Sequence, residues 1–360
     1  MENHTDFQSY ESDASPFISP DSLKDGYTYI PGTGFVRSDP AALQRHHLKY
    51  IATRVGASMI FYILLSVFIT IPVVLLYSLI GLPIGVNFNT MKIYGTQLML
   101  QVVNFTSTVI TLGIPALFLW GSFRRCADLK SVFSAPRLRI FPFALPIVLA
   151  GSVLSAFAAG LLQNGMMALG YYVSIPSYSI PDQPLEFILT VILLTLIPAI
   201  LEEILFRGLI MQGLRCFGDG MALAVSSLLF ALAHFNLMQD ANAMIMGLLI
   251  GYFVLRTGSV WTGVILHFTV NAVSLLETLL FRTAFMEQSE LVGNVISLIF
   301  LTVGFVAFLL FIRKEDTAFS IPLLKNSLLP CSKRATICFG SVGMILAFLL
   351  FVFFSIQAGL

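Results

Sequence analysis

Residues 198–209 read PAILEEILFRGL, a stretch that sets two glutamates and an arginine inside an otherwise apolar run. The chain around it is just as apolar. Of its 360 residues 57% are hydrophobic and only 11% are charged, and its mean hydropathy is +0.88. Soluble domains carry about 25% charged residues. The composition therefore predicts an all-α polytopic membrane protein and excludes a soluble globular domain.

The number of transmembrane helices follows from the apolar runs, because a helix needs about 20 such residues to cross the hydrocarbon. We expect eight or nine spans, the uncertain one being a short run at 220–235. The short runs at 220–235 and 241–255 also suit buried or partly re-entrant helices. The other expected spans are 56–81, 97–120, 142–171, 187–206, 259–281, 291–312 and 337–357.

The basic residues predict the orientation, because Lys and Arg in short loops stay on the cytoplasmic side. With nine spans and a cytoplasmic N-terminus, all but two of the 20 basic residues fall inside. The exceptions are Lys92 and Arg282. The C-terminus is then expected outside.

Residues 1–48 differ from the rest of the chain. They are rich in Ser, Asp, Pro and Tyr and lack apolar periodicity, which predicts a largely disordered cytoplasmic tail without a cleavable signal peptide. The chain has no Gly-rich phosphate loop and no basic-aromatic patch, and its net charge is only +1. We therefore expect the lipid bilayer, and no nucleic acid, among its partners.

The charges in PAILEEILFRGL are not equivalent. Glu203 and Arg207 are four residues apart with the acid first, so on a helix they form an ion pair, which we expect near the cytoplasmic interface. Glu202 points about 100° away from Glu203 and has no partner in this arrangement. An unpaired charge inside a membrane is expensive, which makes Glu202 a functional candidate.

Two histidines lie within the expected spans. Gly218 and Gly220 predict a reversal between two helices, and His234 follows Gly218 at the same distance at which Glu202 precedes it. If both helices run unbroken, Glu202 and His234 lie at one depth. His267 and Asn271 share a face of a later helix. Hydrogen bonding that only packs the helices together is the alternative role for these polar groups.

Three motifs thus follow one another along the chain: EExxxR, FxxxH and HxxxN. Their residues are Glu202, Glu203 and Arg207; Phe230 and His234; and His267 and Asn271. In this order the motifs resemble those of the CAAX-protease and bacteriocin-processing (CPBP, or Abi) family of intramembrane peptidases. The resemblance covers about residues 185–285, and the short connecting loops favour a bacterial type in the plasma membrane.

The composition, the apolar runs and the resemblance together predict a division of the chain into four parts. The tail at 1–48 precedes N-terminal transmembrane helices at 49–184. A catalytic core at 185–285, formed by the fourth to seventh helices, encloses an intramembrane cavity. C-terminal helices at 286–360 complete the protein.

The resemblance also implies peptide-bond hydrolysis in a membrane-associated or lipidated substrate. Glu202 would activate a water molecule that His234 helps to hold, and His267 and Asn271 would stabilise the oxyanion. Hydrogen-bond donors fixed where negative charge develops stabilise the transition state, which agrees with this role for His267 and Asn271. The supporting residues would be Glu203, Arg207 and Phe230, with Phe230 packing against His234.

Two questions stay open at this level. Glu202, His234 and His267 are also a ligand set for hydrolytic zinc, although there is no HExxH helix and the metal-free site is favoured. The other functions are a non-catalytic immunity or scaffold protein and a proton-coupled transporter. Intramembrane Glu and His suit a transporter, but no inverted repeat is present.

Overall fold

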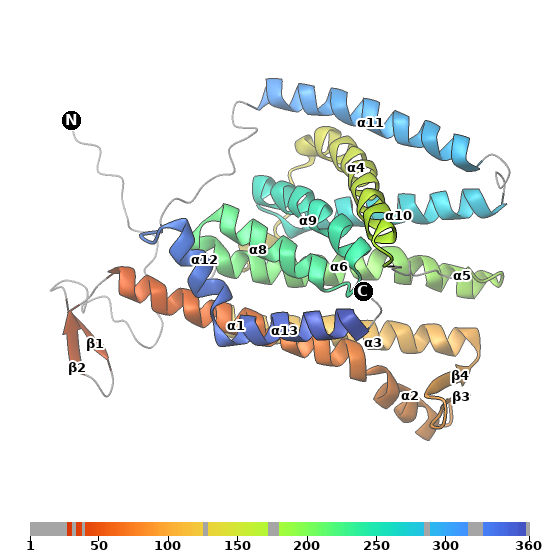
Figure 1. Ribbon diagram of the computed structural model, residues 1–360, viewed down its shortest axis with the longest axis horizontal. Coiled ribbons are helices and arrows are strands. Elements are labelled where there is room, and N and C mark those ends of the chain that lie inside the picture. Colours follow the sequence, from red (N-terminus) through yellow and green to blue (C-terminus); the bar gives the residue numbers. More distant parts are fainter. Residues whose placement is uncertain are drawn as a thin grey trace.

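The computed structural model describes residues 27–30, 34–37, 40–124, 129–171, 180–283, 289–315 and 327–357. Within these residues two short antiparallel hairpins are the only strands: β1 (Tyr27–Ile30) with β2 (Gly34–Arg37), and β3 (Ile84–Asn87) with β4 (Lys92–Gly95). Long helices make up most of the remainder (Figure 1), which confirms the all-α polytopic class.

The helices fall into three groups along the chain. The first comprises α1 (Pro40–Phe68), α2 (Thr70–Leu79), α3 (Gln97–Phe123) and α4 (Phe141–Ala168). The second comprises α5 (Pro184–Val191), α6 (Ile197–Glu203), α7 (Met211–Leu214), α8 (Asp219–Leu232), α9 (Leu237–Thr257) and α10 (Val260–Thr283). The third comprises α11 (Ser289–Lys314), α12 (Cys331–Phe339) and α13 (Val342–Gln357).

Seven helical spans in the described part of the chain are long and apolar enough to cross a membrane. An eighth is present if α12 and α13, which meet at a 67° bend, count as one. Of the two expected numbers, eight and nine, the count with the bent pair agrees with eight. Nine complete spans are wrong, because α8 has only 14 residues, about 21 Å against a hydrocarbon core of about 30 Å. By contrast, α9 begins before the run at 241–255 and reaches full length.

The first span also differs from its expected bounds. Helix α1 begins at Pro40, inside the stretch expected to be a tail, and its early turns bury Leu48 completely. The apolar run at 56–81 is divided after Phe68, where α2 starts. Pro72 explains the division, because it has no N–H to offer the Phe68 carbonyl and its ring clashes with that group.

The second group of helices lies in the middle of the bundle (Figure 1). On one side α1 packs against α13 and α3, and on the other α4 packs against α11 and α9. Gly56 of α1 meets the backbone of Gly343 of α13 so closely that a side-chain carbon would overlap it. Such small residues allow helix backbones to approach within a membrane. The second group of helices thus lies between these two sets.

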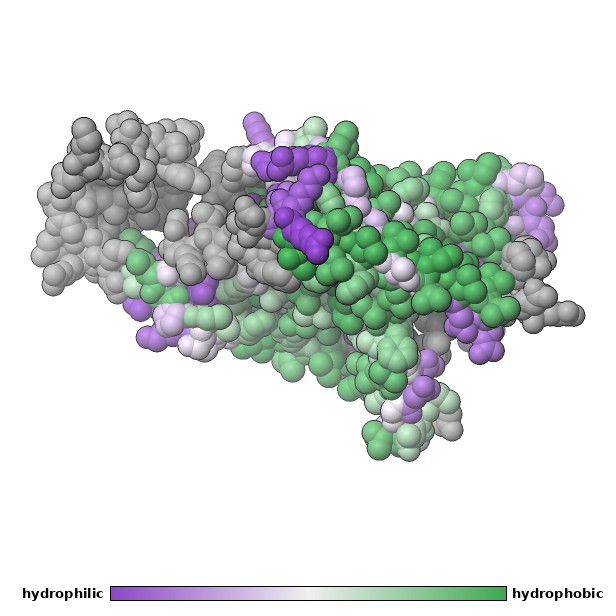
Figure 2. Space-filling model, turned by 90° about the horizontal axis from the view of Figure 1, so that it is seen from above, coloured by the Kyte–Doolittle hydropathy of each residue, from purple (hydrophilic) through white to green (hydrophobic). Residues whose placement is uncertain are grey.

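The surface is suited to lipid. Figure 2 shows hydrophobic residues over most of the described part of one face, with hydrophilic residues gathered in separate patches. Large apolar side chains are widely exposed, among them Leu79 at 83% and Leu298 at 65%. In water such a surface would drive aggregation. The protein is therefore an integral, multi-pass membrane protein.

Candidate active site

A single continuous helical span, residues 184–217, carries the EExxxR motif. Two π-helical segments interrupt it, η4 (Ile192–Leu196) and η5 (Ile204–Ile210), and the short helix α6 lies between them. Pro198 accounts for the first segment, because it has no N–H for the Leu194 carbonyl. π-Helical turns occur often at functional sites. Both glutamates lie at the end of α6, next to the second such segment.

Glu203 is completely buried and has two partners. Its Oε1 lies 2.9 Å from Nη1 of Arg207 and 3.1 Å from Nδ1 of His267. The predicted ion pair is confirmed. The Arg207 side chain is only 1% exposed, so protein encloses it, and its expected place near the cytoplasmic interface stays a prediction.

The surroundings of Arg207 explain how a cation is held there. Its Nη2 donates a hydrogen bond of 3.4 Å to the Gly247 carbonyl of α9. Its guanidinium carbon lies 4.2 Å from the centroid of the Phe230 ring, in a cation–π contact. Such contacts gain strength where water is excluded. Arg207 therefore links the Glu203 helix to α8 and α9.

His267 lies between the two glutamates. Nδ1 faces Glu203, and Nε2 is 3.9 Å from Oε2 of Glu202. The Glu202 side chain keeps 21% of its surface exposed, whereas that of Glu203 keeps none. The two adjacent carboxylates thus differ in environment: one is enclosed and the other is open on one side.

His234 lies on the turn after α8. Its Nδ1 is 3.0 Å from the Phe230 carbonyl and 3.2 Å from the Ala231 carbonyl. Carbonyls only accept hydrogen bonds, so Nδ1 carries the proton and donates it, which leaves Nε2 as an acceptor in the neutral ring. Because α8 ends at Leu232, the unbroken helix assumed in the depth comparison with Glu202 does not extend to His234.

Phe230 connects the three motifs. Its ring lies 5.2 Å from that of His234 and 5.8 Å from that of His267, edge-on in both cases. With its cation–π contact to Arg207, it touches one residue of each motif. The expected packing of Phe230 against His234 is confirmed. Asn271, the last motif residue, is half-buried and lies one turn beyond His267 on α10.

Residues 184–273 match a family model described as type II CAAX prenyl endopeptidase Rce1-like. This segment belongs to that family. The Rce1-like segment holds all seven motif residues, so the resemblance to CAAX proteases drawn from the three motifs is confirmed, and the match supports a protease. Neither the curated proteins nor the solved structures include a match to the chain.

Sequence reasoning missed two residues at this site. Gly263, in the Rce1-like segment, lies one turn before His267; a side-chain carbon there would overlap Oε2 of Glu203 and stand 2.8 Å from Val254. The sequence feature that could have identified Gly263 is its position four residues before His267 in an apolar helix. The other is Tyr62 of α1, whose hydroxyl donates a 2.7 Å hydrogen bond to the Ala233 carbonyl. No local pattern marked it.

The zinc ligand set does not fit this arrangement. Among the residues that the structure describes, no three His, Cys, Asp or Glu side chains are placed so that they could hold one metal ion. We therefore derive no catalytic step through a metal.

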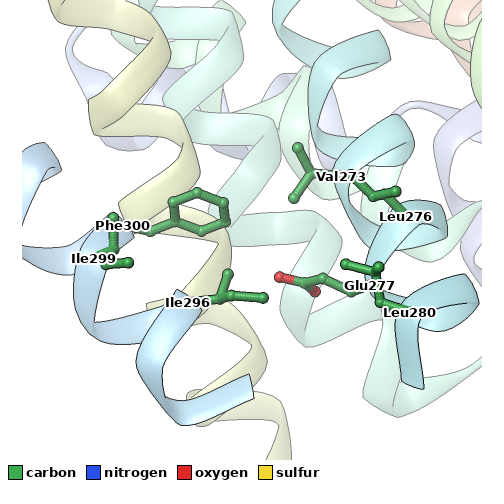
Figure 3. A pocket seen from close by; sticks show the side chains of 7 residues that line it. All are labelled: Val273, Leu276, Glu277, Leu280, Ile296, Ile299 and Phe300. Carbon is green, nitrogen blue, oxygen red and sulfur yellow. The ribbon is translucent and has the colours of Figure 1, made fainter. Parts of the chain in front are cut away.

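Another carboxylate within a candidate span lies just beyond the Rce1-like segment. Glu277 of α10 extends toward α11 across an apolar pocket of about 250 Å³ (Figure 3). The pocket is lined by Val273, Leu276, Glu277, Leu280, Ile296, Ile299 and Phe300. None of these is a motif residue, so this pocket is separate from the site around Glu202.

Proposed function

We propose that the protein is an intramembrane endopeptidase in which Glu202 activates the water that hydrolyses a peptide bond. The observation that carries this proposal is the contrast between the two adjacent glutamates. Glu203 is fully buried and held by Arg207 and His267. The Glu202 side chain is 21% exposed, and its ionic contact is the longer one to His267. Glu203 is thus enclosed by its partners, whereas Glu202 keeps an open side for a water molecule.

Glu202 acts as general base and then as general acid. Its carboxylate takes a proton from water while the water oxygen bonds to the carbonyl carbon of the scissile peptide. The carbonyl π electrons move to oxygen and form an oxyanion. When the intermediate collapses, the C–N bond breaks and the protonated Glu202 delivers its proton to the leaving nitrogen. A positioned acid–base group contributes about 10²- to 10⁴-fold in rate.

His267 and Asn271 are proposed as the oxyanion donors. If His267 carries both ring protons, Nδ1–H donates to Glu203 and Nε2–H remains for the substrate oxygen. The group of Glu202, Glu203, Arg207 and His267 is then electrically neutral, which avoids burying a net charge. The Asn271 amide, one turn along α10, supplies a second donor. Loss of one such donor costs about 10²- to 10³-fold in rate.

His234 is proposed to hold the attacking water. Its Nδ1 is occupied by the carbonyls of Phe230 and Ala231, so only Nε2 is left for another partner. In the neutral ring Nε2 accepts a hydrogen bond from a water proton. That bond orients the water while Glu202 removes the other proton.

The substrate we propose is a membrane-associated peptide or protein, in the first place a prenylated CAAX-type C-terminus. The description of the matched family supplies this class. In this proposal a lipidated substrate approaches from the bilayer, which the exposed apolar side chains of the helices suit. The activity needs no cofactor in this scheme.

The experiment is cleavage of quenched fluorescent peptides, with and without a prenyl group, by purified protein in detergent. Wild type is compared with Glu202→Gln and with the matched control Glu186→Gln, an acid-to-amide change on the same span outside the site. We expect at least about 100-fold loss in Glu202→Gln only. Equal cleavage by wild type and Glu202→Gln sinks the proposal.

A chelator arm decides the zinc alternative. Cleavage that survives the chelator supports the metal-free site. Cleavage that is lost in the chelator and restored by added zinc would show that the site holds a metal. No cleavage of any peptide by wild type would favour the scaffold function.

We further propose that the N-terminus is cytoplasmic. Arg139 and Arg256 share the Glu315 carboxylate, at 3.7 and 3.0 Å, so the start of α4 and the ends of α9 and α11 lie together. Figure 1 places the start of α1 at this end of the bundle and the β3–β4 hairpin with Lys92 at the other. The basic end is expected inside. The short loops favour a bacterial plasma membrane, which stays a prediction.

A further inference from the structure

Helix α8 ends inside the bundle, where its last carbonyl groups need partners. The final carbonyls of a helix accept no hydrogen bond within that helix, and the hydrocarbon core offers no water that could donate one. The Ala233 carbonyl, at the C-cap of α8, accepts the hydrogen bond of 2.7 Å from the Tyr62 hydroxyl. A residue of α1 therefore caps a helix that lies 171 positions later in the chain.

The backbone after His234 takes an unusual conformation. Phe235 has φ +52°, in the left-handed region that residues other than glycine rarely adopt. Such a conformation persists only where the surroundings hold it. Two rings hold it here. The Tyr62 ring is stacked on Phe235 at 6.2 Å and an interplanar angle of 5°, and Phe351 of α13 packs on it at 5.5 Å.

Tyr62 contacts the His234 turn on both sides. Its side chain packs against the buried core. It touches the residues that precede and follow His234 in sequence, Ala233 and Phe235. Neither α1 nor α13 belongs to the Rce1-like segment.

We infer that Tyr62 is a positioning residue, which fixes the His234 turn relative to Glu202 and so completes the site from outside the Rce1-like segment. The inference rests on the proposed function. The hydroxyl fixes where α8 ends, and the ring holds the strained residue that follows His234. Without the hydroxyl the turn loses its cap, and the His234 ring moves relative to Glu202.

The test is Tyr62→Phe, which keeps the stacked ring and removes only the hydroxyl. We expect kcat to fall about 10-fold, the effect of one lost buried hydrogen bond expressed at the site, with KM within about twofold. The matched control is Tyr77→Phe. It removes another interhelical hydroxyl contact, at 2.6 Å to Thr106, far from the motifs. The control is expected to keep the wild-type kcat.

A lower share of folded protein would also reduce kcat, so a second readout is required. Protein with ¹⁵N-labelled histidine reports the His234 ring nitrogens directly. We expect Tyr62→Phe to shift these signals and Tyr77→Phe to leave them unchanged. Unshifted signals together with wild-type kcat would overturn the inference. Because the spectra need no turnover, they test the position of His234 even if wild type cleaves nothing, the result that would overturn the proposed function.

Discussion

The buried Glu203–Arg207 pair makes a quantitative prediction. Both side chains are at most 1% exposed, and Arg207 supplies the shorter of the two contacts to the Glu203 carboxylate. Arg207→Met keeps much of the side-chain volume but leaves that carboxylate buried with His267 alone. Removing one partner of a buried pair costs about 3–5 kcal/mol, because the remaining carboxylate has lost its shorter ionic contact and the group as a whole is no longer neutral. We therefore expect Arg207→Met to lower the free energy of unfolding by about 3–5 kcal/mol.

The assay is reversible unfolding by SDS in mixed micelles, followed by circular dichroism. The control is Arg139→Met, which removes an 83% exposed arginine 3.7 Å from Glu315 and should cost under about 1 kcal/mol. The double variant Glu203→Gln with Arg207→Met removes both charges. It should recover about 2–3 kcal/mol relative to the sum of the single variants.

An effect of Arg207→Met as small as that of Arg139→Met would refute this prediction. Additive effects of the two single changes at Glu203 and Arg207 would refute it equally. Either result would mean that water or lipid headgroups reach the pair and screen it. The burial of the pair would then not describe the protein in a membrane.

Two more predictions follow. Gly263→Ala should lower stability by about 1–3 kcal/mol and reduce kcat, because the new methyl group overlaps the Glu203 carboxylate. Gly160→Ala, on a helix face with open space, should be neutral or slightly stabilising in the same unfolding and cleavage assays; equal effects would contradict the crowding argument. For orientation, a membrane-impermeant maleimide should label Lys92→Cys on intact cells but reach Arg139→Cys only after permeabilisation. The reverse pattern would invert the topology.

The sequence determined the features that depend on local spacing and on the solvent. Apolar runs predicted a helical membrane protein, because hydrocarbon forces backbone groups to pair within each segment. The four-residue spacing of Glu203 and Arg207 predicted their ion pair, because side chains at that spacing meet on a helix. The same spacing placed His267 and Asn271 one turn apart on α10. Gly218 predicted the reversal after the Glu202 span, and it has φ +123°.

Only the tertiary structure decided which partners meet across the bundle. Periodicity places a residue on a face but does not state which helix covers that face. For that reason the motifs did not predict three contacts: His267 between the glutamates, Gly263 against Glu203, and Tyr62 at the end of α8. The end of α8 before His234 was hidden as well, because apolar residues continue past it. A carbonyl at such a helix end needs a donor from elsewhere in the fold, and here α1 supplies it.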